Sequence, residues 1–104
     1  MIIVMGQVQV VPERMADALA LSLAHVQRSR TEPGCLSHAV YEDRDQPNRL
    51  VFVEEWASEE SLQRHFAVPA SVDFVNALSS MAAGRPRIRM YQADELPFPG
   101  TRTS

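Results

Sequence analysis

The chain has 104 residues, of which 45% are hydrophobic and 22% charged, a size and balance typical of one globular domain. Its net charge of −3 is spread without runs of like sign, which argues against nucleic acid or an anionic membrane as a partner. No apolar segment approaches the ~20 residues that cross a bilayer, so we expect a cytoplasmic protein.

A strand and a helix open the chain. Residues 2–11 alternate as in a strand, with one side apolar throughout and the other mixing apolar and amide side chains. Pro12 suits the first position of a helix, and hydrophobic residues at three- and four-residue spacing continue the amphipathic pattern to about Thr31. Pro33 disfavours helical geometry before it and Gly34 tolerates a positive φ, so we expect the helix to end there.

Two further strands form a predicted hairpin. They span residues 36–42 and 50–56, and the polar residues 43–48 between them favour a turn. In the second strand, two aromatic side chains and a carboxylate share one side, and two valines and a carboxylate share the other. Phe52, Glu54 and Trp56 make up the first side, and Val51, Val53 and Glu55 make up the second.

A helical period follows the hairpin. Ser58 is a good N-cap, and two acidic residues follow it where the first turn of a helix favours negative charge. Leu62 and Phe66 lie four residues apart on one face. Pro69 interrupts the pattern, and a second helical stretch ends near Gly84.

The predicted order is strand, helix, strand, strand, helix pair and strand, with the last strand at 87–93. This order is the ferredoxin-like split βαββαβ arrangement of the α+β class, with a four-stranded antiparallel sheet. We expect residues 1–94 to form this domain and residues 95–104 to form an extended tail. Because both sides of the strand at 50–56 carry apolar groups, both need a covering layer, and a homodimer of face-to-face sheets is its simplest source.

The histidines are the first candidates for chemistry, since the chain lacks a Gly-rich phosphate loop, a paired-cysteine metal pattern and a GxSxG motif. A histidine titrates near neutral pH and can accept a proton from a phenol or an enol. His65 is either such a base or a surface residue of an amphipathic helix, and His38 is either a pocket base or an interior histidine. His25 is interpreted as structural, and Cys35 as a small packed residue.

Glu54 is the carboxylate most closely flanked by apolar side chains, those of Phe52 and Trp56. Burial between them would raise its pKa and suit it to acid or base catalysis. A structural ion pair with Arg87 or Arg89 is the alternative, because a buried carboxylate is costly unless it is paired. The two aromatic residues are themselves either core or a platform on which a substrate stacks.

Residues 32–65 resemble the antibiotic biosynthesis monooxygenase (ABM) family, and the resemblance extends over residues 2 to about 93. The family's recurring features are E-P-G-C or a near variant after the first helix, and then F-x-x-x-E-x-W-x-[SD]-x-x-x-L-x-x-H. The matching positions in this chain are Glu32, Pro33, Gly34, Cys35, Glu54, Trp56, Ser58, Leu62 and His65.

The resemblance implies a dimeric ferredoxin-like α+β barrel that oxygenates a small aromatic substrate, such as a quinol or anthrone, with O₂ and without flavin, metal or haem. In that chemistry a base removes a proton, and the resulting anion passes an electron to O₂ in a dry pocket. The expected catalytic residues are His65, His38 and Glu54. The expected substrate-binding residues are Trp56, Phe52, Phe66 and Tyr41.

Two departures separate this chain from branches of the family. Many quinol-oxidising relatives carry a second histidine five residues after the first, where this chain has Ala70. The haem-degrading branch uses an Asn, a Trp and an axial His, and Gln7, His65 and Val75 occupy those positions here, so haem degradation is not expected.

Two functions of different classes therefore follow from the sequence. The first is a cofactor-independent monooxygenase that oxidises a small quinol or polyphenol. The alternative is a member of the same fold that does not oxygenate, either a small-molecule binding or stress protein or a cofactor-free isomerase. Oxygen uptake with hydroquinones distinguishes the two.

Overall fold

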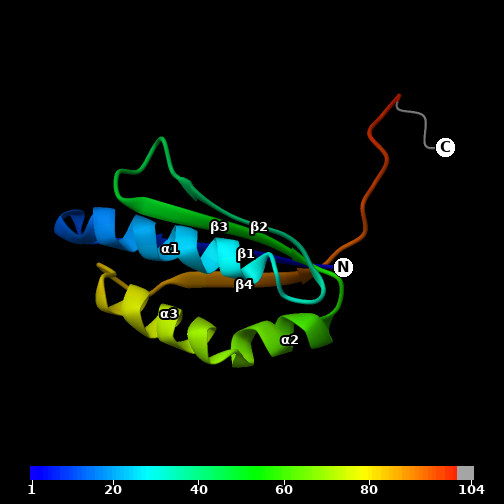
Figure 1. Ribbon diagram of the computed structural model, residues 1–104. Helices are drawn as coiled ribbons and strands as arrows, with labels where there is room; N and C mark the ends of the chain where they lie inside the picture. Colours follow the sequence, from blue (N-terminus) through cyan, green and yellow to red (C-terminus); the bar gives the residue numbers. More distant parts are fainter. Residues whose placement is uncertain (101–104) are drawn as a thin grey trace.

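The computed structural model describes residues 1–100 and contains four strands and three α-helices in the predicted order (Figure 1). The elements are β1 (Ile2–Gln9), a 3₁₀ turn η1 (Pro12–Arg14), α1 (Met15–Ser29), β2 (Cys35–Glu42), β3 (Arg49–Trp56), α2 (Glu59–Ala67), α3 (Pro69–Ser80) and β4 (Arg87–Gln92). Neighbouring strands are antiparallel and lie in the order β2-β3-β1-β4, which confirms the ferredoxin-like α+β fold. Within residues 1–100 every helix is too short or too polar to cross a bilayer.

The helices cover the side of the sheet that carries the aromatic residues of β3, a choice that the sequence left open (Figure 1). Burial on this side forms two apolar clusters. One lies around Leu50 and Phe52, and the other lies around Trp56. Glu54 sits between them along β3, so the only polar position of this strand's buried side divides the core in two.

The other side of the sheet has no covering layer among residues 1–100. Met5, Tyr41 and Tyr91 on this side are 46%, 58% and 44% exposed, and Val51 and Val53 of the central strand β3 are only half-buried. Both sides of β3 therefore carry apolar side chains, as predicted. The helices bury one side, and the other side is not covered by another element among residues 1–100.

A tight loop joins α1 to β2 and packs against the start of α2. Gly34 has φ +84°, as its place in the loop predicts, and its carbonyl accepts a hydrogen bond from the Ala57 N–H at 2.8 Å. Ser58 and Ser61 form a capping box at the start of α2, each side chain accepting from the other's backbone N–H. A Cβ on Gly34 would lie 2.4 Å from the Cβ of Ser61, so the absence of a side chain lets the loop and the helix meet.

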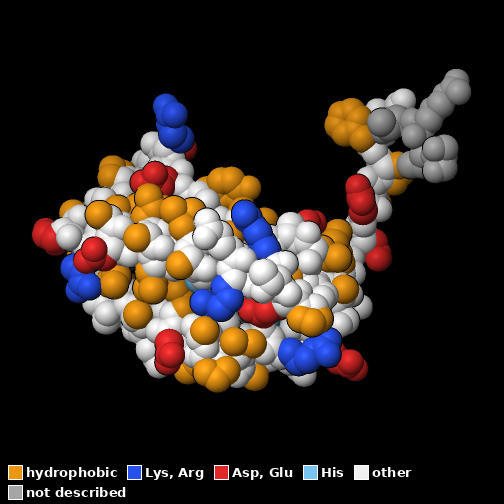
Figure 2. Space-filling view, in the orientation of Figure 1, with side chains coloured by type: hydrophobic (Ala, Val, Ile, Leu, Met, Phe, Trp, Pro, Cys, Tyr) orange, Lys and Arg blue, Asp and Glu red, His pale blue; other side chains and the backbone are white. Residues whose placement is uncertain are grey.

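The chain leaves the sheet after β4 as a tail. Residues 93–98 form no helix or strand, and Figure 1 shows the segment extending away from the domain. Leu96 and Phe98 are 82% and 77% exposed, and Figure 2 shows hydrophobic side chains near the end of the segment. The division into a domain and a tail stays a prediction, since positions 101–104 of the predicted tail lie outside the described residues.

Gly34→Ala should destabilise the fold by roughly 2–4 kcal/mol, because it combines a positive φ with an overlap against Ser61. Urea unfolding followed by circular dichroism measures this loss. Gly84→Ala is the matched control, since nothing lies within 4 Å of its added Cβ, and we expect it to change the free energy of unfolding by less than about 0.5 kcal/mol or to raise it slightly. Equal effects of the two substitutions would contradict this account.

Candidate functional site

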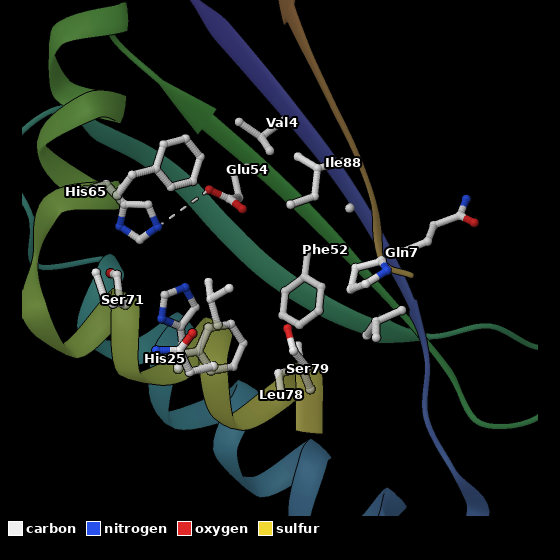
Figure 3. A pocket seen from close by; sticks show the side chains of 18 residues that line it. Val4, Gln7, His25, Phe52, Glu54, His65, Ser71, Leu78, Ser79 and Ile88 are labelled. Carbon is white, nitrogen blue, oxygen red and sulfur yellow. Dashed lines mark ion pairs between the residues drawn. The ribbon is translucent and has the colours of Figure 1, made fainter. Parts of the chain in front are cut away.

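A cavity of about 300 Å³ lies between the sheet and α3 (Figure 3). Most of its lining is apolar, and polar side chains gather where α1 and α2 approach β3. This group consists of His25, Glu54, His65 and the hydroxyl of Ser71 at the start of α3. Gln7, Asn76 and Ser79 also line the cavity. The apolar lining includes Val4, Val8, Phe52, Phe66, Phe74 and Leu78. The site is thus a mostly apolar cavity with ionisable side chains at one end.

The outer rim of the cavity is made of apolar residues that are only partly covered. Val72 and Val75 of α3 and Ile88 of β4 line it and are 46%, 49% and 57% exposed. Since the far side of β4 has no neighbouring strand in the order β2-β3-β1-β4, the cavity is least enclosed beside this edge.

His65 is held at the ionisable end by α2. The buried face of this helix is formed by Ser61, Leu62 and His65, which follow the spacing of one helical face, and His65 is 2% exposed. The alternative of a surface histidine is therefore wrong. The sequence left the surface interpretation open because Leu62 and Phe66 suggested a different buried face of α2. Phe66 is in fact 41% exposed, so the apolar residues of this helix do not by themselves show which face is covered.

The two nitrogens of His65 face two different carboxylates. Nδ1 lies 2.8 Å from Glu32 Oε1, and Nε2 lies 3.9 Å from Glu54 Oε1, the contact dashed in Figure 3. A carboxylate beside Nδ1 keeps the proton of a neutral imidazole on that nitrogen, which leaves the lone pair on Nε2. A protonated His65 would have negative charge on both sides. The indole ring of Trp56 packs on the same imidazole, with 4.6 Å between ring centroids.

Glu54 is the centre of the cluster. Its Oε1 accepts a hydrogen bond from the indole N–H of Trp56 at 2.9 Å and lies 3.2 Å from His38 Nε2. Burial acts to raise the pKa of Glu54, but the nearby His38, the Trp56 hydrogen bond and His65 outweigh it, so the net pKa is lowered. The predicted raised pKa is therefore wrong, because His38 lies beside the carboxylate and, together with the indole N–H of Trp56 and with His65, outweighs the effect of burial.

Glu54 also lacks the arginine partner that the sequence offered as an alternative. Arg87 and Arg89 pair with Gln7 and Met5 across β1, and this register places them on the uncovered side of the sheet. Its partners are histidines instead, one from β2 and one from α2.

His38 lies directly beside Glu54 in the β2–β3 pairing and is 1% exposed. It is thus an interior histidine, as one of the two interpretations held, and it also contacts the site. Its Nε2 approaches Glu54 without the alignment of a hydrogen bond, and its Nδ1 has no hydrogen-bond partner among the described residues. A nitrogen this deeply buried without a partner, as Nδ1 is, is unusual and costly.

His25 is part of the same cluster, which sequence reasoning missed. It lies on α1, stacks on Phe74 with 3.9 Å between ring centroids, and takes a hydrogen bond from Arg28 at Nδ1. Burial, with the charges of His38, His65 and Arg28, lowers the pKa of His25 to about 3, so its ring is neutral at physiological pH. The spacing of residues in α1 could have shown that His25 is buried, since it shares one helical face with Ser22, Val26 and Ser29. This spacing could not show which strands the face contacts.

The three histidines form a triangle. Their ring centroids are 5.2, 5.2 and 5.6 Å apart, and one nitrogen from each falls within 4.8 Å of the others. Such a group can hold a metal ion, although the sequence led us to expect no metal. The rings come from α1, β2 and α2, so only the tertiary fold brings them together.

The predicted substrate-binding residues divide into three groups. Phe52 and Phe66 line the cavity. Trp56 is completely buried and supports Glu54 and His65 from behind, so it contacts the site without forming its wall. Tyr41 lies opposite Val51 on the uncovered side of the sheet and is 58% exposed, so the structure does not bring it to the cavity.

Cys35 is half-buried and packs against the apolar cluster around Trp56, as expected of a small packed residue. Burial and the nearby Glu32 and Glu54 raise the pKa of its thiol, so the group stays protonated at neutral pH. Its place is structural.

The fold and the buried histidine–carboxylate cluster define a class of small α+β proteins with an ionisable pocket beneath one sheet, and comparison with known proteins specifies the family. The family profile described as antibiotic biosynthesis monooxygenase matches residues 1–77, so the chain belongs to this family. The uncharacterized protein sll1783 of Synechocystis sp. is 34% identical over 94 residues, which make up 90% of this chain and 64% of that protein. The chain therefore spans a little under two thirds of that relative's length.

Solved structures agree with this assignment. A candidate antibiotic biosynthesis monooxygenase from Deinococcus radiodurans superposes with a TM-score of 0.89 at 28% identity, over 94% of this chain and 97% of that one. A conserved protein from Methanosarcina mazei Go1 gives a TM-score of 0.85 at 27% identity, over 89% and 92% of the two chains.

The shifted pKa values predict that the protein loses stability in acid. The unfolded chain takes up a proton at His25 below about pH 6.5, whereas the folded chain resists it down to about pH 3, so stability is complete above pH 6.5 and falls as the pH decreases. The lowered pKa of Glu54 acts in the same direction, but only below its ordinary value of 4.5. Between pH 4.5 and 6.5, His25 should contribute up to about 1.4 kcal/mol per pH unit.

Urea titrations across this pH range measure the slope for the wild-type chain and for His25→Gln, which cannot take up the proton. We expect the variant to show a shallower dependence on pH, whatever its stability at pH 7. Parallel curves would show that His25 is not held neutral by the fold.

Proposed function

We propose that this chain is a monooxygenase that oxidises a small quinol or polyphenol with O₂, using His65 as the base. The observation that carries the proposal is the position of His65 Nε2. The Glu32 carboxylate beside Nδ1 favours the tautomer with the lone pair on Nε2, and His65 lies between Glu32 and Glu54 and lines the mostly apolar cavity. Membership of the ABM family supports the class of reaction.

Proton removal is the step for which the cluster is best suited. His65 Nε2 would accept a phenolic proton, and the imidazolium formed would lie between the carboxylates of Glu32 and Glu54. These charges are already in place, so they favour the ion pair without reorganisation during the reaction. The fixed tautomer means that the accepting nitrogen needs no ring flip before each turnover.

The oxygenation itself requires no external reductant. A hydroquinone and O₂ give a hydroxyquinone and water: one oxygen atom enters the ring, the other leaves as water, and the ring supplies all the electrons that O₂ takes up. The protein has to generate the electron-rich phenolate and keep it beside O₂ away from water. Aromatic and aliphatic side chains line the cavity, which suits it to this role.

The size of the cavity favours a substrate of one or two rings. An apolar cavity of about 150 Å³ holds benzene, and the cavity here is about 300 Å³. Phe52, Phe66 and Phe74 offer edges and faces against which an aromatic ring can pack.

Binding without oxygenation is the second candidate, and a specific observation favours it. Ala70 takes the place of the second histidine of many quinol-oxidising relatives, so the chain has a single histidine on the two helices α2 and α3. A chain that binds hydroquinones but consumes no O₂ above background would support this candidate and overturn the first.

His65→Ala should lower the rate of O₂ uptake by about 10²–10⁴-fold with whichever hydroquinone the wild-type chain oxidises, because it removes the base. An oxygen electrode and a panel of substituted hydroquinones provide the measurement. Arg64→Ala is the matched control, since this neighbour on α2 is exposed and lies outside the polar cluster, and it should keep the wild-type rate. Equal rates in His65→Ala and the wild type would show that another group accepts the proton.

We also propose that two chains associate through the uncovered side of the sheet, as in the dimeric barrel that the family resemblance implies. Apolar side chains at the middle of this side support the proposal, namely Met5 on β1 and Val53 on β3, which are paired neighbours. Covering them removes apolar surface from water, and a chain of this length gains proportionally from a second copy.

Val53→Glu should convert a dimer of about 23 kDa, twice the 11.6 kDa of one chain, into a monomer, since it places a charge at the centre of the proposed interface. Sedimentation velocity at micromolar concentration measures the mass. Leu23→Glu on α1 is the control, because Leu23 is 45% exposed on the helical side and should not affect association. A monomeric wild-type chain, or dissociation by both substitutions, would contradict the proposed interface.

A further inference from the structure

All the histidines of this chain meet at one point. The sequence contains three, and His25, His38 and His65 are all buried, with one nitrogen from each within 4.8 Å of the others. We infer that this cluster is a binding site for a divalent transition-metal ion, with the three imidazoles as ligands and the carboxylate of Glu54 as the fourth. This inference goes beyond the proposed oxygenase and does not depend on it, although it assigns a second role to His65.

The donor set selects a class of ion. Three imidazoles and one carboxylate suit Zn²⁺, Fe²⁺, Co²⁺, Ni²⁺ or Cu²⁺, whereas Mg²⁺ and Ca²⁺ require mostly oxygen donors. The charge also suits a cation, since Glu32 and Glu54 approach the cluster from two sides. The metal alone, without a cofactor, is therefore the expected ligand.

Two of the three histidines present the right atom to an ion. His65 donates from Nδ1 to Glu32, the carboxylate–histidine arrangement that fixes Nε2 as the metal-binding nitrogen. Nε2 of His65 and Nε2 of His38 lie 3.9 Å and 3.2 Å from the same atom, Glu54 Oε1. The donors of β2, β3 and α2 thus converge.

His38 supplies an independent observation. Its ring is 1% exposed, and neither nitrogen has a well-aligned hydrogen bond among the described residues. Buried polar groups are normally satisfied, but Nδ1 has no partner among the described residues and Nε2 has only the carboxylate oxygen of Glu54 at 3.2 Å, so this ring has capacity for a further ligand beside two other histidines. A metal ion bound at Nε2 would be one.

The cluster has to contract to coordinate an ion. Zinc–nitrogen bonds of about 2.05 Å place tetrahedral ligand atoms about 3.4 Å apart, against separations of up to 4.8 Å here. The widest separation between ligand atoms has to shrink by about 1.4 Å, which side-chain rotations that move each nitrogen by less than about 1 Å can supply. The ions that tolerate several geometries, such as Zn²⁺ and Co²⁺, are therefore the best probes.

Arg28 opposes binding and so gives the site a distinctive signature. Its guanidinium donates to His25 Nδ1, which holds the proton of this ring on Nε2. Ligation through Nε2 moves that proton to Nδ1, where it would face the guanidinium, so Arg28 has to turn away. Arg28→Gln should therefore bind metal more tightly, because the amide oxygen can accept a hydrogen bond from Nδ1–H.

The test uses the untagged full chain, stripped with a chelator and titrated with Zn²⁺ by calorimetry and with Co²⁺ by visible absorption. We expect one ion per chain and Co²⁺ bands of a four- or five-coordinate site, both reversed by EDTA. His38→Gln should weaken binding at least about 100-fold, and Glu32→Gln about 10–100-fold. Cys35→Ser is the matched control and should bind as the wild type does, since the thiol is not among the donors.

Arg28→Gln distinguishes the proposed site from a surface site, and we expect about tenfold tighter binding. Glu32→Gln keeps the inference testable if His38→Gln does not fold, as judged by circular dichroism. The inference is overturned if the wild-type chain binds neither ion at one per chain, or if Glu32→Gln and Arg28→Gln both bind as the wild type does. Because binding is measured without quinol or O₂, failure here leaves the oxygenase to be judged by its own assay.

Discussion

The carboxylate of Glu54 is the group on which the rest of the site depends. It lies on the buried side of the central strand β3, where every other position is apolar, and it divides the core into two clusters. A charge in this place is tolerated only because an indole N–H and two imidazoles surround it. The identities of Trp56, His38 and His65 are therefore linked: a change in one leaves the same carboxylate short of a partner.

The linked groups also restrict what the cluster can do at one time. His65 Nε2 has one lone pair, which can take a proton from a phenol or bind a metal ion, but cannot do both at once. Glu32 supports either role, since it holds the same tautomer in both. Arg28 favours proton transfer over metal binding, because it lies beside His25 Nδ1 and disfavours the tautomer of His25 that would bind an ion through Nε2.

The sequence was sufficient for the fold and for part of the site. Alternation in β1 and β3, the cap at Ser58 and the break at Pro69 predicted the elements, because these signals are local. Sequence could not show which side of β3 meets the helices, since both sides are apolar, and so Tyr41 was grouped with residues on the opposite side. His25 was missed for a related reason: its helical stripe was visible, but the convergence of α1, β2 and α2 on one point is a property of the packed chain.

The outer rim of the cavity has a consequence for how this protein can change over evolutionary time. Val72, Val75 and Ile88 shape the space available to a ligand, yet each is about half exposed, so their replacement removes little buried area. The polar cluster at the other end is buried and interdependent. Ligand preference can therefore drift through single, nearly neutral substitutions at the rim while the polar cluster stays the same, an arrangement that favours diversification of ligands around one set of ionisable groups.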